Sequence, residues 1–228
     1  MSEIRNVLLV GATGLIGTKV MEASRDMPWL HLIALTRREA PMPSGVRMEM
    51  LVAPTTGWPA AIAALEPDAV ICALGTTIKK AGSEEAFREV DYDLVLMVAR
   101  AAKEAAVQNF VLISSVGADA HAKAFYLRVK GEIEAAVTKV KLRRLDILRP
   151  GLLRGARDGD LRPLEQLGKI ASPMADLFLH GDKRRYRSIS GVTVAAGAIQ
   201  CAREKAQGRY QHDNDSIHRF ARRLADAE

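Results

Sequence analysis

Residues 6–17 of the 228-residue chain read NVLLVGATGLIG. The apolar run that ends at Val10 is continuous, as expected for a strand that is buried on both faces of a sheet. Glycines follow at a spacing of three, at Gly11, Gly14 and Gly17, and glycine has the backbone freedom that a sharp turn needs. The apolar pattern then resumes with a helical period. This stretch therefore predicts a strand, a tight glycine turn and a helix.

The same alternation of strands and helices continues along the chain. Apolar runs bounded by turn residues predict strands at residues 6–10, 30–35, 47–52, 69–73, 110–113 and 145–148. Helical patterns between these runs predict helices at residues 15–25, 59–65, 83–107 and 125–140. Because the strand runs do not alternate between apolar and polar residues, we expect an α/β fold with a doubly wound parallel sheet between helical layers. Such sheets bind ligands at the carboxyl ends of their strands.

The pattern weakens after Pro150. Residues 151–160 are expected to form a loop, residues 163–171 a helix, and residues 189–204 a short strand followed by a helix. Neither a repeat nor a flexible linker separates this part from the rest. We therefore predict a single domain, with a core at residues 1–150 and a C-terminal, substrate-side segment at residues 151–228 packed over the ligand edge of the sheet.

Composition restricts the class of protein. Hydrophobic residues make up 48% of the chain and charged residues 26%, as in folded globular proteins. The net charge of +6 could attract an anion, but aromatic residues are only 5% and zinc-finger spacing is absent, so nucleic acid is a minor alternative. Two cysteines predict neither a disulfide framework nor a metal site. Without a secretory pattern or a long apolar run, we expect no membrane span and a cytoplasmic location.

The glycine turn has the context of a dinucleotide-binding loop. It follows the first strand and opens a helix, so its backbone N–H groups and the helix N-terminus favour a pyrophosphate. The loop lacks the Gly-Lys-Ser/Thr order of a nucleotide-triphosphate P-loop, which argues against ATP. The residues expected to bind the cofactor here are Gly11, Thr13, Gly14, Leu15, Ile16 and Gly17.

Two arginines follow the second predicted strand, at the point where NAD-binding proteins usually carry an acidic residue. Arg37 and Arg38 suit a 2′-phosphate instead, because guanidinium groups form charge-assisted bonds to phosphate oxygens. One such bond is worth roughly 1.5–3 kcal/mol, or about a tenfold to hundredfold preference. The sequence therefore predicts NADP(H), with an ordinary pair of surface arginines as the alternative.

A serine pair and a Tyr-x-x-x-Lys motif follow the glycine turn in the chain. Ser114 and Ser115 end the strand at residues 110–113, and Tyr126 and Lys130 share one face of the next predicted helix. A free tyrosine titrates at about pH 10, and a nearby cation favours the phenolate that exchanges protons with an alcohol or carbonyl oxygen. We expect Ser115, Tyr126 and Lys130 to be catalytic and prefer Ser115 to Ser114. Turn-forming serines and an ordinary helical Tyr/Lys pair are the alternatives.

Several separated motifs resemble one family in particular. The chain is similar to the Tat-interactive-protein oxidoreductases, an atypical branch of the short-chain dehydrogenase/reductase superfamily, at CALGTT (72–77), KAG (80–82), VD (90–91), SSVGAD (114–119), YLRVKGE (126–132), RPG (149–151) and NDSIH (214–218). The resemblance implies an NAD(P)-binding Rossmann fold. It also implies further cofactor contacts at Leu74, Gly75, Thr76, Thr77, Ser114, Tyr126, Lys130, Pro150, Gly151, Leu152 and Leu153.

These observations lead to one function and two alternatives. We expect an NADP(H)-dependent oxidoreductase that acts on an unidentified small carbonyl compound or alcohol. An NADPH-sensing regulatory protein without turnover is the first alternative, although it has no chemical need for Ser115, Tyr126 and Lys130 together. A flavin or tetrapyrrole reductase is the second. The charge of residues 154–187 hints at an anionic substrate group, and the helices at 83–107 and 125–140 are the candidate surfaces for a homodimer.

Overall fold

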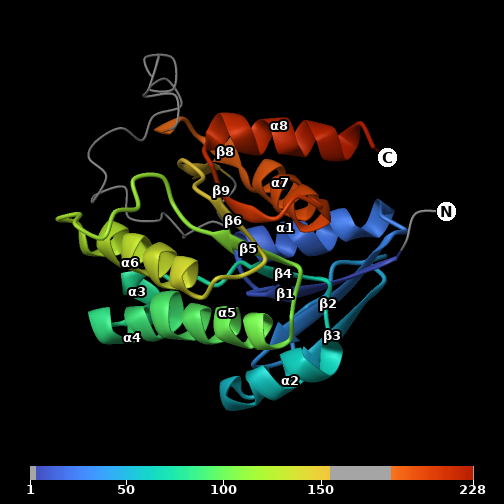
Figure 1. Cartoon of the computed structure of the whole chain (residues 1–228), viewed down its shortest axis with the longest axis horizontal. Coiled ribbons are helices and arrows are strands. Elements are labelled where there is room, and N and C mark those ends of the chain that lie inside the picture. Colours follow the sequence, from blue (N-terminus) through green and yellow to red (C-terminus); the bar gives the residue numbers. More distant parts are fainter. Residues whose placement is uncertain (1–3, 155–185, 228) are drawn as a thin grey trace.

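The computed structural model describes residues 4–154 and 186–227. Seven strands form one sheet in the order β3-β2-β1-β4-β5-β6-β9, and all neighbouring strands are parallel (Figure 1). The strands are β1 (Arg5–Val10), β2 (Leu30–Thr36), β3 (Met48–Val52), β4 (Ala69–Cys72), β5 (Asn109–Ile113), β6 (Arg144–Leu148) and β9 (Gly208–His212). The prediction of a doubly wound α/β fold is confirmed.

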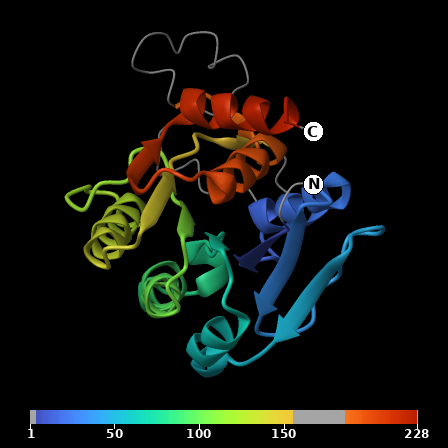
Figure 2. The same ribbon diagram turned by 45° about the vertical axis from the view of Figure 1, so that its right-hand side comes forward.

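Helices cover both faces of the sheet (Figures 1 and 2). One layer holds α1 (Leu15–Ala23) and α7 (Gly191–Arg203), with α8 (Asn214–Ala225) packed against α7. The other layer holds α2 (Trp58–Leu65), α4 (Glu84–Arg88), α5 (Leu94–Glu104) and α6 (Phe125–Lys139). The described chain also contains the short helix α3 (Ile78–Ala81) and a two-stranded parallel pair, β7 (Leu153–Arg154) with β8 (Ile189–Ser190).

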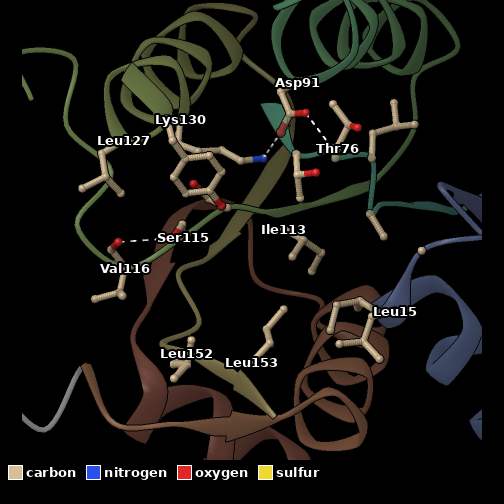
Figure 3. Close-up of a pocket in the computed structure, with 18 of the residues that line it drawn as sticks. Leu15, Thr76, Asp91, Ile113, Ser115, Val116, Leu127, Lys130, Leu152 and Leu153 are labelled. Atoms are coloured by element: carbon tan, nitrogen blue, oxygen red, sulfur yellow. Dashed lines mark hydrogen bonds and ion pairs between the residues drawn. The ribbon is translucent and has the colours of Figure 1, made fainter. Parts of the chain in front are cut away.

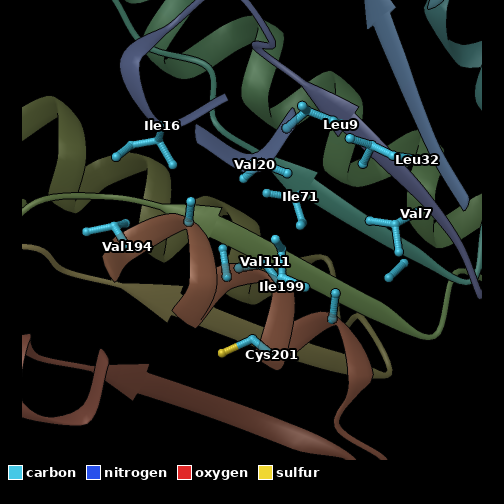
Figure 4. Close-up of a cluster of buried hydrophobic side chains, with 14 of the residues drawn as sticks. Val7, Leu9, Ile16, Val20, Leu32, Ile71, Val111, Val194, Ile199 and Cys201 are labelled. Atoms are coloured by element: carbon cyan, nitrogen blue, oxygen red, sulfur yellow. The ribbon is translucent and has the colours of Figure 1, made fainter. Parts of the chain in front are cut away.

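Side chains of each central strand point alternately into two apolar cores. In β1, Val7 and Leu9 pack toward α1 and α7, whereas Leu8 and Val10 pack toward α2, α5 and α6. Figure 4 shows the first of these cores, where strand residues meet Val20 of α1 and other helix residues. This two-sided burial explains the continuous apolar runs in the sequence, because a strand covered on both faces needs apolar residues at every position.

The helix predicted at residues 83–107 is interrupted in its second turn. It consists of α4, a π-helical turn at Glu89–Asp93, and α5. The predicted cap is present, since the Ser83 hydroxyl accepts a hydrogen bond from the backbone N–H of Ala86 at 3.1 Å. A π-turn adds one residue to a helical turn and is frequent at functional sites. Here it contains the buried Asp91.

The C-terminal part differs from the sequence expectation. Instead of only packing over the ligand edge, it adds α7 to one face of the sheet and β9 to its edge, where Leu148 of β6 is in register with His212. Neither β9 nor α8 was predicted. The strand reads GRYQH and is mostly exposed, so it lacks the apolar run that identifies buried strands. The helix predicted at residues 163–171 lies outside the described residues.

Candidate functional site

A cavity lies at the carboxyl ends of β1, β4, β5 and β6 (Figure 3). It encloses about 1140 Å³ of empty space, including its opening to solvent. Six segments contribute its walls. The lining residues are 14–16 after β1, 73–78 after β4, 113–116 at the end of β5, Asp91 with Ala124, Tyr126, Leu127 and Lys130 of the helical layer, and 151–153 after β6.

The glycine turn is packed against the end of β4. Gly11 has a φ of +91°, and a Cβ there would lie 2.5 Å from the carbonyl carbon of Ala73. A Cβ at Gly17 would lie 2.2 Å from the carbonyl oxygen of Gly11. Helix α1 then begins with no side-chain cap at Gly14 and no acidic residue in its first turn. Its first N–H groups therefore remain able to bind an anion at the edge of the cavity.

The predicted cofactor residues divide into two groups. Thirteen predicted cofactor residues line the cavity: Gly14, Leu15, Ile16, Leu74, Gly75, Thr76, Thr77, Ser114, Tyr126, Lys130, Gly151, Leu152 and Leu153. Outside that lining are Gly11, Thr13, Gly17, Arg37, Arg38 and Pro150. Arg37 and Arg38 are exposed just beyond β2, whose Leu35 is in register with Val10 before the glycine turn. They therefore follow the strand that neighbours this turn.

The three predicted catalytic residues all line the cavity. Lys130 is buried, and its Nζ lies 2.8 Å from Oδ1 of the fully buried Asp91 (Figure 3). The other carboxylate oxygen of Asp91 accepts a hydrogen bond of 2.7 Å from the backbone N–H of Thr76. Asp91 thus connects the Tyr-x-x-x-Lys helix to the segment that follows β4.

Sequence reasoning gave Asp91 no role. A signal was present, because Asp91 lies four residues from both Phe87 and Val95, on the apolar stripe of the helix. A carboxylate on such a stripe is costly unless it is paired. Its partner could not be identified from spacing, since Lys130 comes from a different helix.

The Tyr126 ring is fixed by an aromatic neighbour. It packs edge to face against the buried Phe87, with ring centroids 5.9 Å apart and an interplanar angle of 66°.

The Ser115 hydroxyl donates a hydrogen bond of 3.2 Å to the carbonyl oxygen of Val116, its neighbour in the chain. This contact is long, so the hydroxyl can turn to a ligand at little cost.

Ser114 has a different environment from Ser115. Its hydroxyl donates a hydrogen bond of 2.5 Å to Glu134 of α6. The Glu134 carboxylate also accepts hydrogen bonds from Nε and Nη2 of Arg149, which follows β6. The Ser114 side chain therefore ties β5 to α6 and β6, although the residue still borders the cavity.

A second buried polar cluster lies away from the cavity. Asp146, Cys201 and His212 bring possible metal-binding atoms within 4.8 Å of one another. The carboxylate of Asp146 already receives Nε of Arg144 at 2.6 Å and contacts Nε2 of His212 at 2.8 Å. Burial raises the pKa of the Cys201 thiol well above its ordinary value, which disfavours the thiolate that metals bind. We therefore assign this cluster to the packing of α7 on β6 and β9.

The chain matches known proteins at the level of sequence. The model of the family HIM1 matches residues 58–180. The protein "FMP52, mitochondrial" of Lodderomyces elongisporus is 34% identical over 78% of this chain and 90% of its own. The corresponding protein of Emericella nidulans is 36% identical over 75% of this chain and 79% of its own.

Solved structures with the same fold are more distant in sequence. MoeE5 in complex with UDP-glucuronic acid and NAD has a TM-score of 0.67 at 15% identity, covering 90% of this chain and 75% of its own. The UDP-N-acetylglucosamine 4-epimerase of Methanobrevibacter ruminantium has a TM-score of 0.67 at 13% identity, covering 98% of this chain and 82% of its own. These similarities show the Rossmann-type fold.

The comparisons correct two expectations. The cytoplasmic location is contradicted, because the curated relatives are named mitochondrial proteins. That expectation rested on the two cysteines and on the absence of a secretory pattern and of a long apolar run. None of the described helices is long and apolar enough to cross a lipid bilayer.

The short-chain-dehydrogenase-like fold is supported, but the narrower resemblance to the Tat-interactive-protein oxidoreductases is not. By its sequence, the chain belongs to the HIM1 family and is a relative of the FMP52 proteins.

Proposed function

We propose that this protein is an NADP(H)-dependent oxidoreductase that interconverts a small carbonyl compound and an alcohol. One observation carries the proposal: residues after the glycine turn and the set Ser115, Tyr126 and Lys130 border the same cavity at the carboxyl edge of the sheet. A sheet of this class binds its ligands at that edge. A site for pyrophosphate and a site for proton transfer are therefore joined by one continuous space.

Support for a dinucleotide cofactor comes from the glycine turn. The uncapped start of α1 offers N–H groups and a positive dipole end to a pyrophosphate. Solved structures with this fold include complexes with NAD, which agrees with a nicotinamide cofactor. Support for the phosphorylated form comes from Arg37 and Arg38, since exposed guanidinium groups beyond β2 suit a 2′-phosphate.

The residues of this chain would perform the proton part of the reaction. When bound, a nicotinamide supplies or accepts the hydride at the substrate carbon. Ser115 donates a hydrogen bond to the carbonyl oxygen and orients it. Tyr126 gives its hydroxyl proton to that oxygen during reduction and takes the proton back from the alcohol during oxidation. The ammonium of Lys130 stabilises the phenolate that remains, and Asp91 fixes the position of Lys130.

A turnover assay with one substitution tests the chemistry. We would follow NADPH oxidation with a panel of aldehydes, ketones, quinones and flavins, comparing the parent with Tyr126→Phe. We expect Tyr126→Phe to lower kcat by at least about 100-fold while NADPH still binds, because only the proton donor is lost. Reduction that is unaffected by this change would point to a flavin-type reductase. NADPH binding without turnover of any compound would point to a sensor.

A second test addresses the choice of cofactor. Arg37→Ala is expected to weaken NADPH binding at least about tenfold and to leave NADH binding unchanged, because only the phosphate contact is lost. Fluorescence titration of each cofactor measures both affinities. Arg100→Ala is the matched control, since it removes the same charge from an exposed position of α5. Equal weakening of NADPH and NADH by Arg37→Ala would contradict the assignment to the 2′-phosphate.

A further inference from the structure

We infer that the carbonyl compound carries apolar, uncharged substituents, an inference that rests on the proposed function. It concerns the part of the cavity beyond Ser115 and Tyr126. Four residues with apolar side chains form this part: Val116, Leu127, Leu152 and Leu153. Figure 3 shows Leu152 and Leu153 on the opposite side of the cavity from Lys130 and Asp91, with Val116 and Leu127 at a third side. We call these four residues the apolar wall.

Within residues 4–154 and 186–227, the cavity lining provides no unbalanced charge to bind a charged substrate group. Among the described residues that line the cavity, the acidic and basic side chains are Asp91 and Lys130. They neutralise each other across 2.8 Å. A phosphate or carboxylate placed against the apolar wall would lose its hydration without gaining a counter-charge, which is strongly unfavourable. A methylene group placed there gains free energy from leaving water.

The apolar wall is held by hydrogen bonds of the backbone. The N–H of Val116 donates to the carbonyl oxygen of Pro150 at 2.9 Å, and the N–H of Ile189 donates to that of Leu152 at 2.8 Å. The N–H of Gly151 donates to the side chain of Asn214 at 2.8 Å. These bonds join the end of β5, the segment after β6 and the start of α8. The backbone that carries the wall residues is therefore held in place by the fold.

The earlier hint of an anionic substrate group stays a prediction. That hint came from the charges of residues 154–187, most of which lie outside the described residues. The apolar wall lies within the described residues and lines the same cavity as Ser115, where the carbonyl oxygen would bind. Substituents attached to the carbonyl carbon must therefore pass along apolar side chains.

Specificity constants for a substrate series test the inference. From propanal to hexanal, we expect kcat/KM to rise roughly threefold to fourfold with each added methylene, because each one buries more apolar surface. Succinic semialdehyde and glyceraldehyde 3-phosphate, which carry a carboxylate and a phosphate, are expected to be at least about 100-fold poorer than hexanal. A charged aldehyde or a UDP-sugar used better than hexanal would overturn the inference and leave the oxidoreductase proposal intact. Failure to turn over any carbonyl compound would overturn both.

A charge placed on the apolar wall provides a second test. Leu127→Arg is expected to lower kcat/KM for hexanal at least about tenfold and to raise it for succinic semialdehyde, because the new guanidinium pairs with the carboxylate and Leu127 is not a predicted cofactor contact. Val192→Arg is the matched control, since Val192 is an exposed apolar residue of α7 outside the cavity. Binding of the uncharged dye Nile red, measured by fluorescence, reports on the wall without turnover. Loss of dye binding in Leu127→Arg alone supports the inference, and unchanged dye binding contradicts it.

Discussion

Lys130 Nζ and Asp91 Oδ1 lie 2.8 Å apart, with 6% and 0% of the two side chains exposed. Because both charges are buried, each one depends on the other, and removing either leaves an uncompensated charge in the protein interior. Asp91 also receives the N–H of Thr76. The pair therefore fixes a catalytic candidate on α6 relative to the segment that follows β4.

Replacing Asp91 tests the importance of this pair. Asp91→Asn keeps an oxygen for the N–H of Thr76 but removes the negative charge that faces Lys130. We expect the free energy of unfolding, measured by urea denaturation, to fall by about 3–5 kcal/mol. Glu132→Gln is the matched control, because Glu132 pairs with Arg88 at 2.6 Å where the side chains are 30% and 38% exposed. It should cost less than about 1 kcal/mol. Similar losses in the two variants would show that the buried pair contributes no more to the free energy of unfolding than an exposed pair does.

The two adjacent serines should have separable roles. Ser115→Ala is expected to lower kcat by about 100-fold with little change in thermal stability, because it removes a donor to the substrate oxygen. Ser114→Ala should instead lower the free energy of unfolding by roughly 1.5–3 kcal/mol, since it removes a hydrogen bond to the buried Glu134 carboxylate. Steady-state kinetics and denaturation of both variants check this. A reversed pattern would assign the chemistry to Ser114.

The glycine turn can be tested with two glycines that differ in their surroundings. Gly11 and Gly82 have similar positive φ values, +91° and +88°. A Cβ at Gly11 would collide with the backbone of Ala73, whereas a Cβ at Gly82 would meet nothing within 4 Å. Gly11→Ala is expected to abolish NADPH binding in a fluorescence titration. Gly82→Ala should cost only about 1–2 kcal/mol of stability from backbone strain and leave binding intact. NADPH binding by Gly11→Ala at the parent's affinity would argue against the pyrophosphate site.

Cys72 predicts a dependence of stability on alkaline pH. Burial raises the pKa of its thiol from 9.0 to about 12. The folded protein therefore keeps the thiol protonated where the unfolded chain loses the proton, so stability decreases as the pH rises above 9. The stability difference between the parent and Cys72→Ala should shrink by about 1.4 kcal/mol between pH 8 and pH 10. Urea denaturation at both values measures it, and a constant difference would mean that the thiol is accessible to water.

The sequence could predict the elements whose pattern is set by burial. Strands β1, β4 and β5 are covered on both faces, so their continuous apolar runs identify them. The site residues that follow these strands, such as Gly14 and Ser115, could then be placed at one edge of a parallel sheet. Contacts between distant parts of the chain could not be predicted in this way. The pairing of Asp91 with Lys130 and that of Ser114 with Glu134 depend on how the π-helical turn at Glu89–Asp93 and the end of β5 pack against α6, which local spacing does not determine.

The position of strand β9 in the chain constrains the order in which the protein can fold during synthesis. Its residues pair with β6, and the neighbouring Asn214 accepts a hydrogen bond from Gly151 at the cavity. During synthesis on the ribosome, residues 208–214 emerge long after the glycine turn and the Tyr-x-x-x-Lys helix are made. Before residues 208–214 are made, the nascent chain lacks strand β9, which pairs with β6. It also lacks the Asn214 side chain, which accepts the hydrogen bond from Gly151. The proposed coenzyme site is therefore completed only late in synthesis, after residues 208–214 have been made.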